Sequence, residues 1–127
     1  MAREHERVLQ LPVDFAPTHE TAGLPGFPAV DLFAPAGTRV LVNFRGTVRK
    51  LSGRKLSGAE RPGGAYGYSF YVRNGGNGRE RYVTHLGTRS VKLGQQIEPG
   101  SFVGTVAVPP LGSRPGSAHV HLGKHFP

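Results

Sequence analysis

The sequence predicts an all-β fold, a compact antiparallel β-sheet or sandwich. Nineteen glycines and eleven prolines divide the chain into short runs of valine, isoleucine, leucine, phenylalanine and tyrosine, which is typical of strands joined by turns. No long stretch repeats apolar residues at the i, i+3, i+4 spacing of an amphipathic helix. With 127 residues and no cysteine, the chain has the length of one domain whose core forms without disulfides.

The expected elements follow in order along the chain. Residues 8–15 predict an edge strand interrupted by Pro12, because proline removes a backbone donor from the sheet. Residues 16–28 are rich in proline and glycine and predict a loop. Further strands are expected at 29–34, 38–44, 46–51, 67–73, 80–85, 101–107 and 118–123. The glycine-rich connection at 52–65 is long enough to predict a functional rim or flap rather than a simple turn.

The chain carries a net charge of +8 and has a pI near 10.6. A local basic cluster comprises Arg45, Arg49, Lys50, Arg54 and Lys55. We therefore expect a polyanionic partner, either nucleic acid or a bacterial envelope, since both attract cations through the same long-range field. Charge alone does not choose between them.

No segment reaches the length of apolar residues that a membrane span needs, and no secretory apolar run follows the charged residues at 1–7. We expect a soluble protein made in the cytoplasm. It would reach a target outside its cell by lysis, in a phage particle or as part of a larger parent protein.

Two histidines in the last expected strand share one face. His119 and His121 lie at i and i+2, so their imidazoles leave the same side of the strand roughly 6.6 Å apart. Either one nitrogen binds a metal while the other ring handles a proton, or the pairing is coincidental. Without cysteine, any metal must bind to histidine, aspartate or glutamate.

Asp31 and His85 are two further candidates. Asp31 lies in an apolar strand, where a buried carboxylate needs a cation, a set of hydrogen-bond donors or a metal. A carboxylate that accepts backbone N–H groups at a strand end is the alternative. His85 is expected at the end of a strand, where a purely structural histidine would also be ordinary.

Taken in order, these residues resemble the lysostaphin- and LytM-type zinc endopeptidases of metallopeptidase family twenty-three, in a phage- or actinobacterial-type variant. The resemblance covers roughly residues 19–127. It is carried by Asp31 with Ala34-Pro35-Ala36-Gly37-Thr38-Arg39-Val40 and Gly46-Thr47-Val48, then Tyr66-Gly67, Tyr82-Val83-Thr84-His85-Leu86, Val91-Lys92-Leu93-Gly94-Gln95-Gln96-Ile97-Glu98-Pro99-Gly100, Val103-Gly104 and His119-Val120-His121.

The resemblance implies a groove over one face of the sheet, one Zn²⁺ per chain and cleavage of peptide cross-links or stem peptides in bacterial peptidoglycan, as in an endolysin. It implies that Asp31 and His121 are zinc ligands and that His85 and His119 are catalytic residues. We expect residues 18–127 to form the catalytic domain and residues 1–17 an N-terminal extension. The expected partner is the anionic cell wall rather than a specific nucleic acid, and the expected state is a monomer.

The sequence departs from the family pattern at the third ligand. The family usually has a histidine four residues before the aspartate, where this chain has Phe27, whose ring cannot bind zinc. Either the site has lost a ligand or another histidine replaces it. His19 is our candidate, because it lies on a proline- and glycine-rich loop whose length is inexpensive to change. His5 and His125 are the other histidines that could serve.

In the implied reaction, His119 takes the proton of the attacking water, and His85 stabilises the oxyanion or assists the leaving amine. The 52–65 connection and Tyr66 are expected to wall the groove. Two other hypotheses remain at this point. One is a catalytically inactive relative that binds peptidoglycan or activates a partner hydrolase. The other is a basic nucleic-acid-binding β-barrel in which Phe70, Tyr71 and Tyr82 stack on bases.

Overall fold

The computed structural model describes residues 7–127, which form ten strands and, within that range, no helix. The all-β prediction is therefore confirmed. Within the described residues no helix could span a membrane. The strands are β1 (Val8–Leu11), β2 (His19–Glu20), β3 (Pro28–Phe33), β4 (Arg39–Val42), β5 (Gly46–Arg54), β6 (Gly67–Arg73), β7 (Glu80–Arg89), β8 (Gln96–Ile97), β9 (Phe102–Val106) and β10 (His119–His125).

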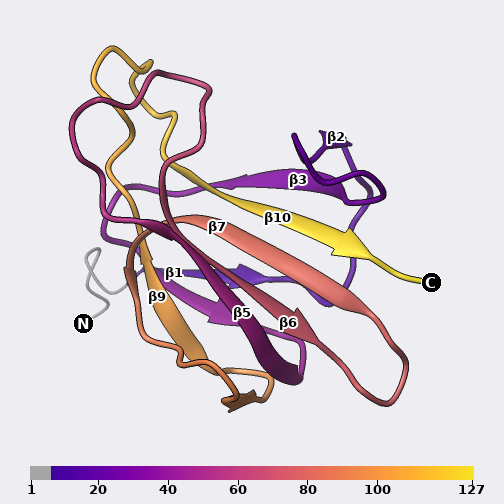
Figure 1. The fold of residues 1–127 in the computed structure, drawn as a ribbon. Helices are drawn as coiled ribbons and strands as arrows, with labels where there is room; N and C mark the ends of the chain where they lie inside the picture. The colour runs from indigo at the N-terminus through magenta and orange to yellow at the C-terminus, as the bar shows by residue number, and fades with distance from the viewer. Residues whose placement is uncertain (1–6) are drawn as a thin grey trace.

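All ten strands belong to one curled sheet (Figure 1). One path through the sheet runs β1-β4-β9-β7-β10-β3-β2, and β6, β5 and β8 continue from the other edge of β7. The β1 and β4 pair is parallel, and every other pairing is antiparallel. The region around β3, β10 and β7 is thus antiparallel, with β1 forming a short parallel edge.

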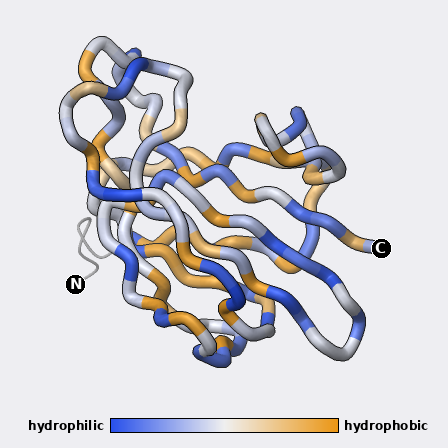
Figure 2. The backbone as a smooth tube through the Cα atoms, in the orientation of Figure 1, coloured by the Kyte–Doolittle hydropathy of each residue, from blue (hydrophilic) through white to orange (hydrophobic). Residues whose placement is uncertain are grey.

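The two faces of β10 differ in chemistry because side chains alternate along a strand. Val120 and Leu122 are fully buried, whereas His119 and His121 lie on the opposite face. Figure 2 shows the same alternation of apolar and polar positions along the central strands. The buried cluster behind the sheet comprises Leu11, Val40, Val42, Phe44, Val48, Phe70, Val72, Val83, Leu86, Val91, Ile97, Val103, Val106, Ala118, Val120 and Leu122.

His85 lies at a β-bulge inside β7, and not at the end of a strand as the sequence analysis expected. The register between β6 and β7 shifts there, so that Thr84 and His85 together stand opposite Ser69. His85 has a φ of 71°, a left-handed conformation that costs a non-glycine residue about 1–2 kcal/mol. The bulge brings two consecutive side chains, Thr84 and His85, to the same face of the sheet.

Two corrections to the expected boundaries concern the segments around the site. Residues 16–28 are not all loop, because the two-residue strand β2 pairs with β3, with His19 opposite Ala29 and Glu20 opposite Pro28. The long connection begins later than expected, since β5 continues to Arg54 and pairs with β6 along this part of its length. Both corrections arise from pairing with distant strands, which local composition does not reveal.

Two further expectations concern the N-terminus and the aromatic residues. The edge strand expected at 8–15 covers only residues 8–11 and ends in the fully buried Leu11, before Pro12, and His5 lies outside the described residues. The division at residue 17 remains a prediction. The base-stacking hypothesis is wrong for two of its three aromatic residues, because Phe70 is 0% exposed and Tyr71 only 7% exposed.

Candidate metal centre and groove

Four neighbouring strands, β2, β3, β10 and β7, place polar side chains on one face of the sheet. Asp31 on β3 stands directly opposite His121 on β10. His19 on β2 stands opposite Ala29, two residues from Asp31 along β3, and is therefore its diagonal neighbour. Cross-strand register thus brings together three residues that are far apart in the sequence.

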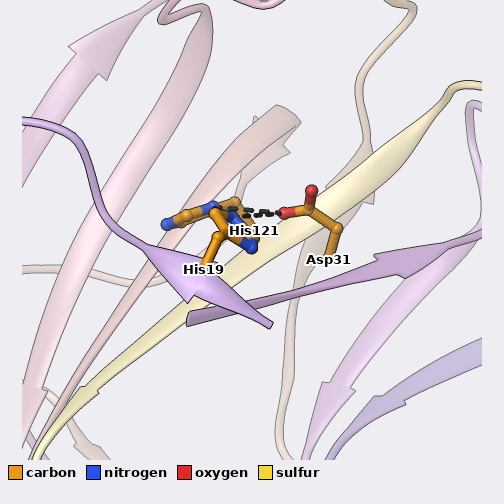
Figure 3. Close-up of side chains that lie close together, drawn as sticks. All are labelled: His19, Asp31 and His121. Atoms are coloured by element: carbon orange, nitrogen blue, oxygen red, sulfur yellow. Dashed lines mark hydrogen bonds and ion pairs between the residues drawn. The ribbon is translucent and has the colours of Figure 1, made fainter. Parts of the chain in front are cut away.

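The three side chains point toward one another (Figure 3). Asp31 Oδ1 lies 3.4 Å from His19 Nε2 and 3.2 Å from His121 Nδ1, and the two nitrogens are 3.3 Å apart. Two ligands of one tetrahedral zinc are separated by about 3.3 Å when the metal bonds are about 2.0–2.1 Å. All three donor atoms lie within 4.8 Å of one another, so this donor set fits a small divalent cation.

The other nitrogen of His19 and of His121 faces a threonine hydroxyl. Thr18 Oγ1 lies 3.0 Å from His19 Nδ1, and Thr21 Oγ1 lies 2.8 Å from His121 Nε2. An imidazole that donates its outer N–H to such an oxygen is held in one tautomer and one orientation, with the inner nitrogen free to bind a metal. Sequence reasoning did not identify these two threonines.

A tight connection between β2 and β3 returns His19 to the site. The Thr21 N–H donates to the Phe27 carbonyl at 2.8 Å, and the Phe27 N–H donates to the Leu24 carbonyl at 3.2 Å. Thr21 then packs directly over Gly123, where a Cβ atom would lie only 2.8 Å from Thr21 Oγ1. Glycine at position 123 therefore makes room for the hydroxyl that contacts His121.

Phe27 occupies a different place on the same face. Its ring stacks on the ring of His125, with centroids 5.5 Å apart, and meets Tyr71 edge-on at 6.4 Å. His125 Nδ1 in turn lies 3.1 Å from the Gly26 carbonyl. Among the described residues, the metal-type cluster contains His19, Asp31 and His121, and neither Phe27 nor His125 belongs to it.

His85 and His119 flank the three donors without joining them. The Nδ1 of His119 donates to the Ser117 carbonyl at 2.7 Å, and the Nδ1 of His85 donates to the Tyr66 carbonyl at 2.9 Å. The two rings are 4.9 Å apart, and His85 also stacks on Tyr66 at 4.0 Å. In each neutral ring, Nε2 is then left as an acceptor for a bound molecule.

Burial shifts the pKa values of three side chains on this face, His85, His121 and Tyr66. It lowers the pKa of His85 from 6.5 to about 4, with a smaller opposing effect from the hydrogen bond to Tyr66. Burial also lowers the pKa of His121, against the attraction of Asp31. The pKa of Tyr66 is raised by burial and by the Asp31 carboxylate. At neutral pH, His85 and His121 are therefore uncharged, the form that binds a metal or accepts a proton.

A groove of about 670 Å³ lies over the three donors and both flanking histidines. Its floor is the face of β3, β7 and β10. Its walls come from three segments: residues 20–22 at the end of β2, residues 62–66 from the long connection after β5, and residues 109–117 before β10. The expectation that Tyr66 and the long connection line the groove agrees with this arrangement.

No protein-family model matches this sequence, and no curated protein does. Several solved structures share its fold. A mutant form of the catalytic domain of the prophage-encoded M23 protein EnpA from Enterococcus faecalis has 17% identity, with 86% of this chain and 75% of that chain covered and a TM-score of 0.57.

Lysostaphin, an antimicrobial peptidase from Staphylococcus simulans, has 19% identity, with 97% of this chain and 48% of that chain covered and a TM-score of 0.59. A zinc-containing peptidase from Vibrio cholerae has 18% identity, with 95% and 37% covered and a TM-score of 0.57. This chain thus spans less than half the length of those two proteins. At these identities the likeness establishes the fold.

Proposed function

The chain has the LytM-type fold of the M23 peptidases, and from that premise we propose that it is a zinc-dependent endopeptidase of bacterial peptidoglycan. The bonds cleaved lie in peptide cross-links or stem peptides. The net charge of +8 suits a protein that works on an anionic cell wall, because opposite charge raises its local concentration there.

One observation carries the proposal. Three donor atoms from three strands, His19 Nε2, Asp31 Oδ1 and His121 Nδ1, meet at 3.2–3.4 Å on the floor of a groove. Two carboxylate-facing imidazoles at this separation, each with its outer nitrogen against a hydroxyl, are typical of a ligand set rather than of an ordinary surface ion pair. Three protein ligands also leave a position open, as in catalytic zinc sites.

The surrounding residues support hydrolysis. A zinc ion at this site would lower the pKa of a water molecule towards ~7 and polarise the carbonyl of the bond to be cleaved. His119 Nε2 lies 3.8 Å from Asp31 Oδ1, so it can accept the proton of a water at the donor cluster. Its Nδ1, anchored on the Ser117 carbonyl, keeps Nε2 in the accepting form.

His85 has a different role in the proposed reaction. Its neutral ring donates through Nδ1 to Tyr66, so Nε2 begins as an acceptor. Negative charge that develops on the substrate favours uptake of a proton from the solvent by Nε2, after which the ring can donate that proton to the oxyanion or to the leaving amine. The stacking against Tyr66 and the bulge at position 85 fix the direction in which this nitrogen points.

Digestion of purified peptidoglycan tests the proposal. The protein should release new amine ends, detected by mass analysis of the soluble fragments. A strong chelator should abolish this release and added zinc should restore it, because the nucleophile depends on the ion. Cleavage that resists the chelator, or binding to cell walls without any cleavage, would contradict the proposal. The second outcome would favour the inactive relative.

A further inference from the structure

A second cavity, of about 650 Å³, adjoins the groove on the side of His119. The junction lies beside His119 because Phe33 is its cross-strand partner and the two rings are 5.3 Å apart. The second cavity therefore continues the groove beyond the catalytic histidines. Six residues line both cavities: Phe33, Pro109, Pro110, Ser113, Arg114 and Ser117.

The junction has an apolar floor and a restrained rim. Phe33 is 62% exposed although it is large and apolar. In the rim, the Ser113 N–H donates to the Pro110 carbonyl at 3.1 Å and the Ser117 N–H donates to the Arg114 carbonyl at 3.2 Å. Figure 1 shows this connection, before β10, rising beside the long connection after β5. These turns pre-organise the junction and so reduce the entropy lost when a ligand binds.

Two polar groups at the junction have no partner among residues 7–127. Ser117 Oγ is buried and makes no hydrogen bond there, which costs about 1–3 kcal/mol unless another molecule satisfies it. Arg114 makes no ion pair with a described residue, and it is the one lysine or arginine in the described lining of either cavity. The lining shared by the two cavities thus contains a guanidinium and a buried hydroxyl that have no partner among the described residues.

We propose that the junction binds a carboxylate of the peptide substrate, with the Arg114 guanidinium as its ion-pair partner and the Ser117 hydroxyl bonded to the adjacent substrate backbone. The inference rests on the proposed function and narrows it. Stem peptides that carry free carboxylates are the substrate class, and an all-glycine bridge is not. Ser117 precedes His119 by two residues, so the substrate backbone bonded to its hydroxyl lies about two residues of extended peptide from the cleaved bond, and the carboxylate belongs to that part of the substrate.

A matched pair of synthetic peptides tests this inference. One carries a free side-chain carboxylate about two residues from the bond to be cleaved, and the other carries the carboxamide at the same position. The zinc-loaded protein should show a kcat/KM about 10- to 100-fold higher for the carboxylate peptide, mainly through KM, because a charge-assisted hydrogen bond is lost in the amide. Pentaglycine should be a poorer substrate than the carboxylate peptide.

Variants assign the effect to Arg114. Arg114→Ala should remove the preference between the two peptides by lowering only the rate on the carboxylate peptide, and Arg114→Lys should retain part of it. Arg73→Ala is the matched control, since Arg73 is exposed on β6 and lines neither cavity. It should behave as the parent does.

The outcomes separate the inference from the proposed function. Cleavage of both peptides at equal rates, an unchanged preference in Arg114→Ala, or equal cleavage of pentaglycine would overturn the inference while leaving the peptidase intact. Cleavage of neither peptide would overturn the proposed function. Calorimetric binding of the same pair then decides the inference: tighter binding of the carboxylate peptide that Arg114→Ala abolishes supports it, and equal or absent binding refutes it.

Discussion

Asp31 and His121 are held by the middle of the sheet, whereas His19 is held at its edge. β3 and β10 share five paired positions around Asp31 and His121, but β2 and β3 share two around His19. The His121 side chain is 10% exposed and the His19 side chain 37%. The core that forms behind β10 therefore fixes Asp31 and His121, while a short connection fixes His19.

Under the proposed function, this difference allows one ligand to come from a different sequence position within the same fold. A donor on paired central strands cannot shift without changing the register of the sheet, which would exchange its two faces. A donor on an edge connection can come from any residue that the loop returns to the same place. Phe27, whose ring packs on His125 and Tyr71, lies outside the donor cluster.

The largest effect is expected on the central half of the site. His121→Ala removes a proposed ligand and the cross-strand partner of Asp31, so metal content should fall to near zero and peptidoglycan cleavage should be lost. Elemental analysis of the dialysed protein measures the first and turbidity of cell-wall suspensions the second. A circular dichroism spectrum unchanged from the parent serves as the control for folding. If His121→Ala retained one zinc per chain, the expected difference between the centre and the edge of the sheet would be wrong.

A smaller effect is expected for the histidines that flank the donors. His119→Ala should keep the metal and lower kcat on the order of 10²–10⁴-fold, because the proposed role of His119 is proton transfer and not metal binding. His85→Asn should act in the same direction, and asparagine tolerates the left-handed backbone at the bulge. Zinc content beside kcat distinguishes the two groups of residues, and loss of zinc in His119→Ala would mean that it is a ligand.

Replacement of Thr21, whose hydroxyl faces His121, should have a smaller effect on zinc binding. Thr21→Val keeps the shape of the side chain and removes the acceptor for the His121 Nε2–H, so zinc affinity should fall roughly 10- to 100-fold. Thr21→Ser should restore it. Competition with a fluorescent zinc indicator measures both. Equal affinity in the valine variant would show that the hydroxyl at 2.8 Å does not orient the ring.

The smallest effect concerns stability of the metal-free protein as a function of pH. Because the pKa of His85 is lowered from 6.5 to about 4, the unfolded chain binds a proton in this range that the folded chain does not. Stability is therefore full above pH 6.5 and falls as the pH drops towards 4. His85 alone should contribute a loss of about 1 kcal/mol between pH 7 and pH 5.5.

Urea unfolding of the parent and of His85→Asn at both pH values measures that contribution. The difference between the two proteins isolates His85 from His121, whose pKa is also lowered. The parent should lose more stability than the variant on acidification. Equal losses would show that burial of the His85 ring does not control its charge.

The central strands could be predicted from sequence because each buries one face. The alternation of His119 and His121 with Val120 and Leu122 is local information, and it placed both histidines on the groove side. Asp31 could be identified as unusual because a carboxylate in an apolar strand needs a partner. The family resemblance then supplied roles for these residues that alternation alone does not give.

The remaining features depend on contacts between distant parts of the chain. The bulge at His85 reflects the register with Ser69 on β6, and nothing in the sequence around His85 indicates it. Thr21 contacts His121, which lies 100 positions later in the sequence. Thr21 follows the two-residue strand β2, inside a proline- and glycine-rich segment. Local patterns therefore predict which face a strand buries, but not where an edge connection returns.

Zinc binding by His19→Ala tests the central claim most directly. The account predicts that the parent binds one zinc per chain and that His19→Ala, although folded, binds it far more weakly, because Asp31 and His121 alone lose most of the chelation. Isothermal titration of the chelator-treated proteins with zinc gives both stoichiometry and affinity. An unchanged zinc affinity in His19→Ala, or a parent that binds no zinc, would contradict the account.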